Sequence, residues 1–225
     1  MAVLRTTNCA RHGHPEFQLV YDPEMVAIDD SVRWFAGWLE ESVAQGTCYT
    51  AGQTCQIGWS VTEVRQRDDG DLTLWEPDMQ HMPIVWSESV SRTLSHLGLQ
   101  KDVVESVLDA EDSSFPSLRE SAVICTRIGQ SKGVVMERTK PSGAYSGWFC
   151  GCLGEDHDHN DVDELRLVSV YEAVVCHAPQ ILPYLALPPG TLASVGADDA
   201  PVIFRDGEPL EFKAGSYLAA RYKTR

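Results

Sequence analysis

Hydrophobic and polar positions in the first part of the chain follow two different periods. Residues 16–21 alternate between apolar and polar side chains, which predicts a half-buried strand. Over residues 29–46 the apolar positions instead recur every three or four residues, which predicts an amphipathic helix. Trp34 and Trp38 lie one turn apart beside the apolar stripe of this helix. We expect both to widen the stripe and to enter the core.

The next stretch returns to strand periodicity before a second helical pattern begins. Residues 47–75 predict β structure, and Asp69-Gly70 supplies the turn of a hairpin. Residues 87–109 carry apolar side chains at helical spacing, which predicts a helix that Gly98 can divide in two.

The second part of the chain combines short strands, an acidic run and short helices. Residues 113–117, rich in serine and containing a proline, predict a connector, so we expect two regions, 1–112 and 113–225. Turns of hairpin length, without regular βαβ spacing, favour an α+β fold with mainly antiparallel sheets packed with helices. The elements expected here are strands at 121–127, 133–138 and 145–150, a solvated acidic loop at 155–164, and helical segments at 169–177 and 179–185.

Charge narrows the range of partners. The 225 residues include 33 acidic and 18 basic side chains, a formal net charge of −15. Residues 1–112 hold 7 basic and 19 acidic side chains (net −12), and residues 113–225 hold 11 and 14 (net −3). Nucleic-acid binding is not expected, because it depends on cations that neutralise phosphates. No apolar run is long enough for a membrane span, and the N-terminus lacks an apolar signal core, so we expect a cytoplasmic protein.

Seven cysteines are an odd number, and most lie among apolar neighbours, as do Cys125 and Cys176. Such cysteines are typical of small core residues that remain free thiols in a reducing compartment.

A cluster of metal-ligand residue types lies near the acidic run. Cys150-x-Cys152 is followed by His157-x-His159, and thiolates with imidazoles suit zinc. Zinc knuckles, however, usually separate their cysteines by two to four residues, and a C-x-C pair on a strand leaves little room for a chelate turn. We therefore expect no metal and no cofactor. An enzyme that uses these four residues with zinc or as thiols is the less favoured alternative.

Motifs for catalysis are missing from the sequence. There is no Gly-x-Ser-x-Gly elbow, no phosphate-binding glycine loop and no dinucleotide fingerprint. The adjacent Cys176 and His177 point about 100° apart on a helix and make no dyad. The sequence thus predicts a protein that is not an enzyme and has no catalytic residues.

A series of short motifs in the second part of the chain carries a family resemblance. Ser146-Gly147-Trp148-Phe149 comes first, then the acidic run, a helix from Ser169, and a proline-rich stretch over 181–191 (ILPYLALPPGT). In this order and spacing, over about 120–205, the chain resembles the bacterial immunity protein 33 domain family. The first half resembles the extension of longer members through residues 52–59, Leu72-x-Leu74-x-Glu76-Pro77-Asp78 and Met82-Pro83-Ile84.

The resemblance implies an α+β protein that binds and neutralises a cognate toxin in competition between bacteria, without catalysis of its own. An acidic inhibitor suits a toxin with a basic surface, since charge complementarity accelerates association. A regulatory or adaptor module of the same fold, which binds another cellular protein, is the alternative. The residues expected to contact the partner are Trp148, Glu155, Asp156, Asp158, Asp161, Asp163 and Glu164.

Overall fold

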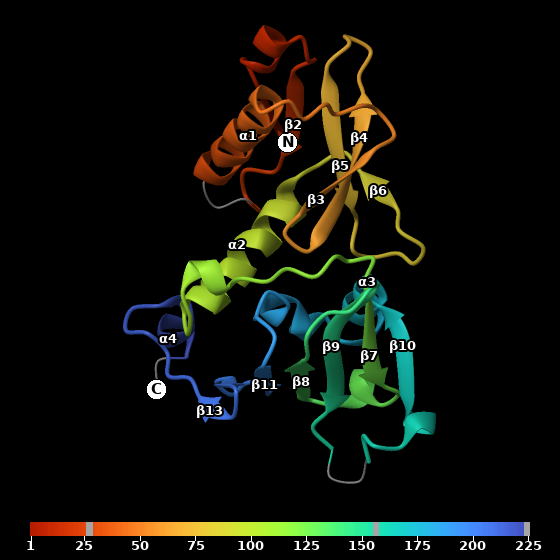
Figure 1. The fold of residues 1–225 in the computed structure, drawn as a ribbon, viewed down its shortest axis with the longest axis vertical. Coiled ribbons are helices and arrows are strands. Elements are labelled where there is room, and N and C mark those ends of the chain that lie inside the picture. Colours follow the sequence, from red (N-terminus) through yellow and green to blue (C-terminus); the bar gives the residue numbers. More distant parts are fainter. Residues whose placement is uncertain (26–28, 155–157, 223–225) are drawn as a thin grey trace. The chain divides into compact units, whose positions relative to one another are not determined.

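The computed structural model describes residues 1–25, 29–154 and 158–222. The chain divides into two compact units, Met1–Leu97 and Gly98–Arg225, and each contains its own sheet (Figure 1). The division falls inside helix α2 (Ser91–Glu105), whereas the sequence placed it at the connector 113–117. That connector belongs to the second unit, because the Ser114 N–H donates to the Ala186 carbonyl at 2.9 Å.

The sheet of the first unit has the order β1-β2-β5-β4-β3, with β6 paired to β5. Its pairs are antiparallel except β2 with β5, which run parallel. The turn at Asp69-Gly70 joins β4 to β5, as the sequence predicted, and Gly70 has a φ of 89°. The strands are β1 (Ala2–Arg5), β2 (Phe17–Tyr21), β3 (Thr54–Ile57), β4 (Ser60–Gln66), β5 (Leu72–Pro77) and β6 (Trp86–Ser87).

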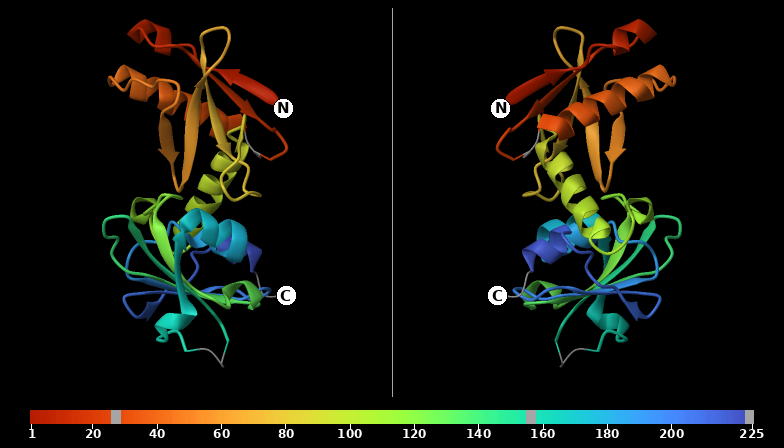
Figure 2. Two further views of the ribbon diagram at one scale, coloured as in Figure 1. Left: turned by 90° about the vertical axis from the view of Figure 1, so that its right-hand side faces the viewer. Right: turned by 90° about the vertical axis from the view of Figure 1, so that its left-hand side faces the viewer.

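Helix α1 (Asp29–Ala44) lies across one face of this sheet (Figures 1 and 2). Its apolar stripe, including the fully buried Phe35 and Leu39, belongs to one hydrophobic core together with residues of β2 and β5. The expectation that Trp34 and Trp38 enter the core is wrong, since they are 55% and 36% exposed. At 100° per residue both lie beside Phe35 on the helix, where they stack on its ring instead of reaching the sheet.

The sheet of the second unit has seven strands in the order β10-β7-β9-β8-β11-β12-β13. The pair β7 and β9 is parallel, and the other pairs are antiparallel. Strands β10 and β13 are therefore the edges. The strands are β7 (Ser121–Cys125), β8 (Val134–Arg138), β9 (Tyr145–Cys152), β10 (Leu165–Ser169), β11 (Thr191–Val195), β12 (Val202–Arg205) and β13 (Glu208–Pro209).

Short helical segments complete both units. The predicted helix after Ser169 is one turn of α-helix that continues as a π-helix, and its Cys176 is exposed, not buried as expected. The segments are η1 (Cys9–His12), η2 (Ala110–Asp112), η3 (Ile128–Gln130), η4 (Val162–Glu164), α3 (Val170–Glu172), η5 (Ala173–His177), η6 (Pro179–Tyr184) and α4 (Tyr217–Arg221).

Two mainly antiparallel sheets packed with helices confirm the predicted α+β class. Within the described ranges, none of the helices combines the length and the apolar character needed to cross a membrane.

Candidate partner-binding surface

The Ser146-Gly147-Trp148 motif lies in β9, inside the second unit. Gly147 has a φ of +86°, and a Cβ built there would lie 2.1 Å from the Thr139 carbonyl oxygen, so only glycine fits. The next residue, Trp148, is fully buried, and its indole N–H donates to the Leu185 carbonyl at 3.1 Å. The motif therefore anchors the proline-rich stretch to the sheet.

A buried arginine holds the same stretch. Arg138, at the end of β8, is 2% exposed, and its Nη1 donates to the carbonyls of Leu187 at 2.6 Å and Leu185 at 3.2 Å, and also to that of Ser114. The guanidinium lies 5.3 Å from the Trp148 ring centroid. Burial lowers the pKa of Arg138 to about 10, because the charged form has lost its water.

Gly190 closes the proline-rich stretch with a second positive φ, +87°. Its N–H donates to the Arg138 carbonyl at 2.8 Å, and a Cβ there would lie 2.6 Å from the Asp206 carboxylate. The motifs that carry the family resemblance thus serve the internal architecture of the domain. Trp148, expected at the partner interface, has no exposed surface to offer, because its ring fills the core.

The acidic run is where the remaining predicted contact residues lie. Glu155 and Asp156 fall outside the described residues. Asp158, Asp161 and Asp163 are exposed. Among these, Asp161 also accepts the Asp163 N–H at 3.1 Å and caps the short helix η4.

Glu164 differs from its neighbours because it is tied to the sheet. Its carboxylate accepts from the Thr126 hydroxyl at 2.7 Å and lies 3.6 Å from Arg127 Nη2. We interpret Glu164 as a residue that fixes the end of the acidic run beside β7.

Exposed apolar side chains accompany the acidic residues. Val162 in η4 is 78% exposed, and Leu167 in the edge strand β10 is 69% exposed. Leu167 follows Glu164 by three residues, which is roughly 10 Å along an extended strand. We call the surface formed by Asp158, Asp161, Val162, Asp163 and Leu167 the acidic edge. It combines negative charge, apolar contact area and a strand at the border of its sheet.

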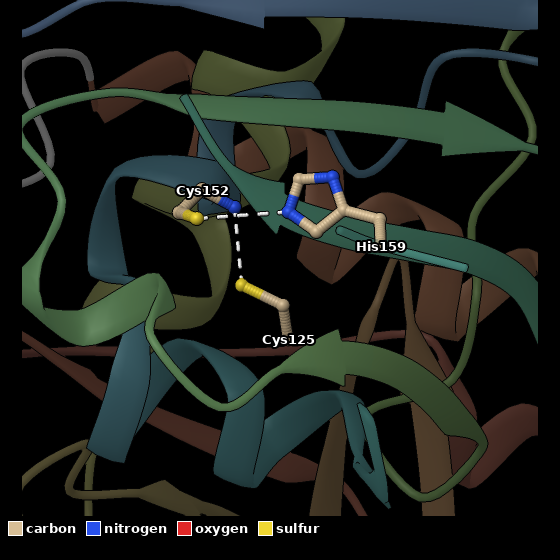
Figure 3. Close-up of side chains that lie close together, drawn as sticks. All are labelled: Cys125, Cys152 and His159. Atoms are coloured by element: carbon tan, nitrogen blue, oxygen red, sulfur yellow. Dashed lines mark hydrogen bonds between the residues drawn. The ribbon is translucent and has the colours of Figure 1, made fainter. Parts of the chain in front are cut away.

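A second group of side chains includes His159, which directly follows Asp158 of the acidic edge. The sulfurs of Cys125 and Cys152 and a ring nitrogen of His159 all lie within 4.8 Å of one another (Figure 3). Cys152 and His159 belong to the cluster considered from the sequence. His157 lies outside the described residues. Cys150 is fully buried in β9, two residues before Cys152. Cys125 was missed, because only the parallel pairing of β7 with β9 brings it to Cys152.

The second unit is an α+β domain in which the motif residues hold the proline-rich stretch against the sheet. Residues 99–206 match the model of the Imm33-like domain family, in agreement with the resemblance to the immunity protein 33 family noted in the sequence. The match lies within the second unit and includes the acidic run. Comparison with curated proteins gave no match, and neither did comparison with solved structures.

Proposed function

We propose that this protein is a non-enzymatic immunity protein that binds a cognate toxin through the acidic edge and thereby neutralises it. The family assignment of residues 99–206 favours an immunity role with a protein partner. It acts, in this proposal, in the cytoplasm of the cell that makes it, where its seven cysteines remain thiols.

The observation that carries the proposal is the composition of the acidic edge. Val162 is exposed between the exposed Asp161 and Asp163, four residues after the exposed Asp158, and Leu167 adds a second exposed apolar side chain on an edge strand. Inhibitor interfaces of this kind use apolar anchors for affinity and surrounding charge for the rate of association. A net charge of −15 adds a long-range attraction toward a basic partner.

Co-expression with the product of the neighbouring gene tests the function, scored by survival of the cells and by co-purification. We expect rescue and a stable complex whose association rate falls as salt increases. No rescue and no complex would refute the immunity role. Enrichment of a housekeeping protein instead would favour the adaptor alternative.

A charge-reversal variant then tests the surface. Asp158→Lys, Asp161→Lys and Asp163→Lys together should abolish rescue and slow association at least about tenfold. The matched control carries three reversals at other exposed acids of the second unit, at Asp198, Asp199 and Glu211.

Replacement of the apolar residues separates contact from charge. Val162→Ala with Leu167→Ala should speed dissociation about tenfold or more while leaving the salt dependence unchanged. Full activity of both the charge-reversal and the apolar variants would place the interface elsewhere. The exposed Trp34 and Trp38 of α1 would be the next surface to test.

A further inference from the structure

The group formed by Cys125, Cys152 and His159 has the spacing of a metal site. The Cys152 sulfur and the His159 Nε2 are 3.6 Å apart, and the three ligand atoms lie within 4.8 Å of one another (Figure 3). Zinc takes sulfur at about 2.3 Å and imidazole nitrogen at about 2.0–2.1 Å, so a tetrahedral site has S···N edges of roughly 3.6 Å. The observed separation equals such an edge.

The imidazole is held in place by β9. A Cβ at Gly151 would lie 2.8 Å from both Cε1 and Nε2 of His159, so the ring occupies the space that a side chain at position 151 would fill. The Phe149 ring meets it edge to face, with 5.5 Å between the centroids. This packing directs Nε2 toward the sulfurs.

Both sulfurs are buried, and the Cys125 sulfur accepts a backbone hydrogen bond. Cys125 is fully buried and Cys152 is 4% exposed. The Cys152 N–H donates to the Cys125 sulfur at 3.2 Å. N–H groups that point at a buried sulfur are suited to a thiolate, the form that binds a metal.

We propose that Cys125, Cys152 and His159 bind one Zn²⁺ ion, with a fourth position left for water or for a side chain of the partner. Two thiolates balance the two positive charges, so the burial cost of the sulfurs as anions is offset. Binding releases the two thiol protons as two Zn–S bonds form. The ion joins the ends of β7 and β9 to His159, the residue that directly follows Asp158, and so fixes the chain next to the acidic edge.

The C-x-C spacing disfavours a zinc site formed by Cys150 and Cys152. In the structure the second sulfur comes from Cys125 on another strand, so this spacing does not limit the site. The proposal is independent of the immunity role, since it concerns metal binding by the isolated protein.

Zinc binding is measured on the full chain, reduced and stripped with a chelator, by competition with a chromophoric chelator and by elemental analysis. We expect one zinc per chain, with thiolate charge-transfer bands when Co²⁺ replaces it. Cys125→Ser and Cys152→Ser should each weaken binding at least about 100-fold. The double variant Cys48→Ser, Cys176→Ser removes exposed thiols and should bind as the unaltered chain does.

Because the buried cysteine variants can fail to fold, two milder changes keep the test decisive. His159→Gln removes a half-exposed ligand, and Gly151→Ala displaces the ring without touching any ligand. Both should weaken zinc binding about 10–100-fold, while His12→Gln, at an exposed histidine, should not. Wild-type affinity in both variants, or no zinc bound by the unaltered chain, would overturn the proposal.

Discussion

Replacement of Arg138 by Met tests how the second unit is held together. Methionine has a similar length and leaves only a small cavity, so the change isolates the hydrogen bonds of the guanidinium. Nη1 carries two hydrogens, which its three acceptors share, at Ser114, Leu185 and Leu187. Two hydrogen bonds from a charged donor contribute together about 3–6 kcal/mol. The Leu185 carbonyl keeps its bond from Trp148.

The cost of burying the charged arginine reduces the net stabilisation that these hydrogen bonds provide. Burial lowers the pKa of Arg138 well below its ordinary value, to about 10, which corresponds to about 3 kcal/mol held against the charged form. Removal of the charge recovers part of that cost. We therefore expect a loss near the lower end of the range, about 3 kcal/mol. Arg138→Lys keeps the charge but not the planar fork, and should lose about 1–2 kcal/mol.

The free energy of unfolding is measured in urea. Unfolding is monitored by hydrogen exchange in peptides from β8, β9 and β11, because these report on the second unit alone. The matched control is Arg166→Met, at an exposed arginine of β10, with an expected change below about 0.5 kcal/mol. A loss of unfolding free energy below about 1 kcal/mol for Arg138→Met would refute the reasoning. It would mean that the carbonyls left without the guanidinium form other hydrogen bonds of similar strength.

Two further substitutions follow from backbone geometry and from a buried carboxylate. Gly147→Ala should cost about 3 kcal/mol or prevent folding because its Cβ meets the Thr139 oxygen, whereas Gly143→Ala, with positive φ but open space, should cost about 1–2 kcal/mol in the same urea assay. Burial raises the pKa of Glu16, but hydrogen bonds from Thr6 and two backbone N–H groups outweigh it and the net pKa is lowered. The stabilisation from ionised Glu16 is thus present above the unfolded pKa of about 4.3 and is lost as the pH falls through the pKa of the folded state. Glu16→Gln should therefore flatten the decline in stability at acid pH. An unchanged dependence of stability on pH would contradict this.

The sequence pattern predicted those helices and strands in which buried positions recur with the period of the helix or strand itself. The helix at 29–46, the hairpin at Asp69-Gly70 and the three strands of residues 121–150 were found close to their predicted positions. Gly98 does not divide α2, since one exposed glycine in a helix costs only about 1 kcal/mol.

Edge strands were harder to predict. Strand β10 was not predicted; in the structure Arg166 and Leu167 are both exposed, so burial does not alternate along it. It exists because it pairs with β7, about forty residues away along the chain. Strand β1 was missed as well, and it too depends on a partner, β2, for its hydrogen bonds. Pairings of this kind are set by the whole fold.

For the site, the sequence indicated the acidic run but not what surrounds it. Trp148 next to glycine in a strand carried no signal that its indole N–H would meet the Leu185 carbonyl in the core. The Cys125 sulfur lies beside Cys152 through a parallel pairing that connects distant segments. The sequence therefore identified the candidate residue types, whereas the residues that contact them could be identified only from the strand topology.

The two classes of residue in this domain should respond differently to mutation. Arg138, Gly147 and Trp148 hold the scaffold, so their replacement lowers stability and reduces partner binding only through the fraction of chains that unfold. Asp158 and Asp163 are exposed at the acidic edge, and exposed positions tolerate change without loss of fold. Proteins that share this scaffold can therefore differ in partner through such side chains alone. Binding lost at full stability is the signature of the acidic edge, and binding lost in proportion to stability is that of the scaffold.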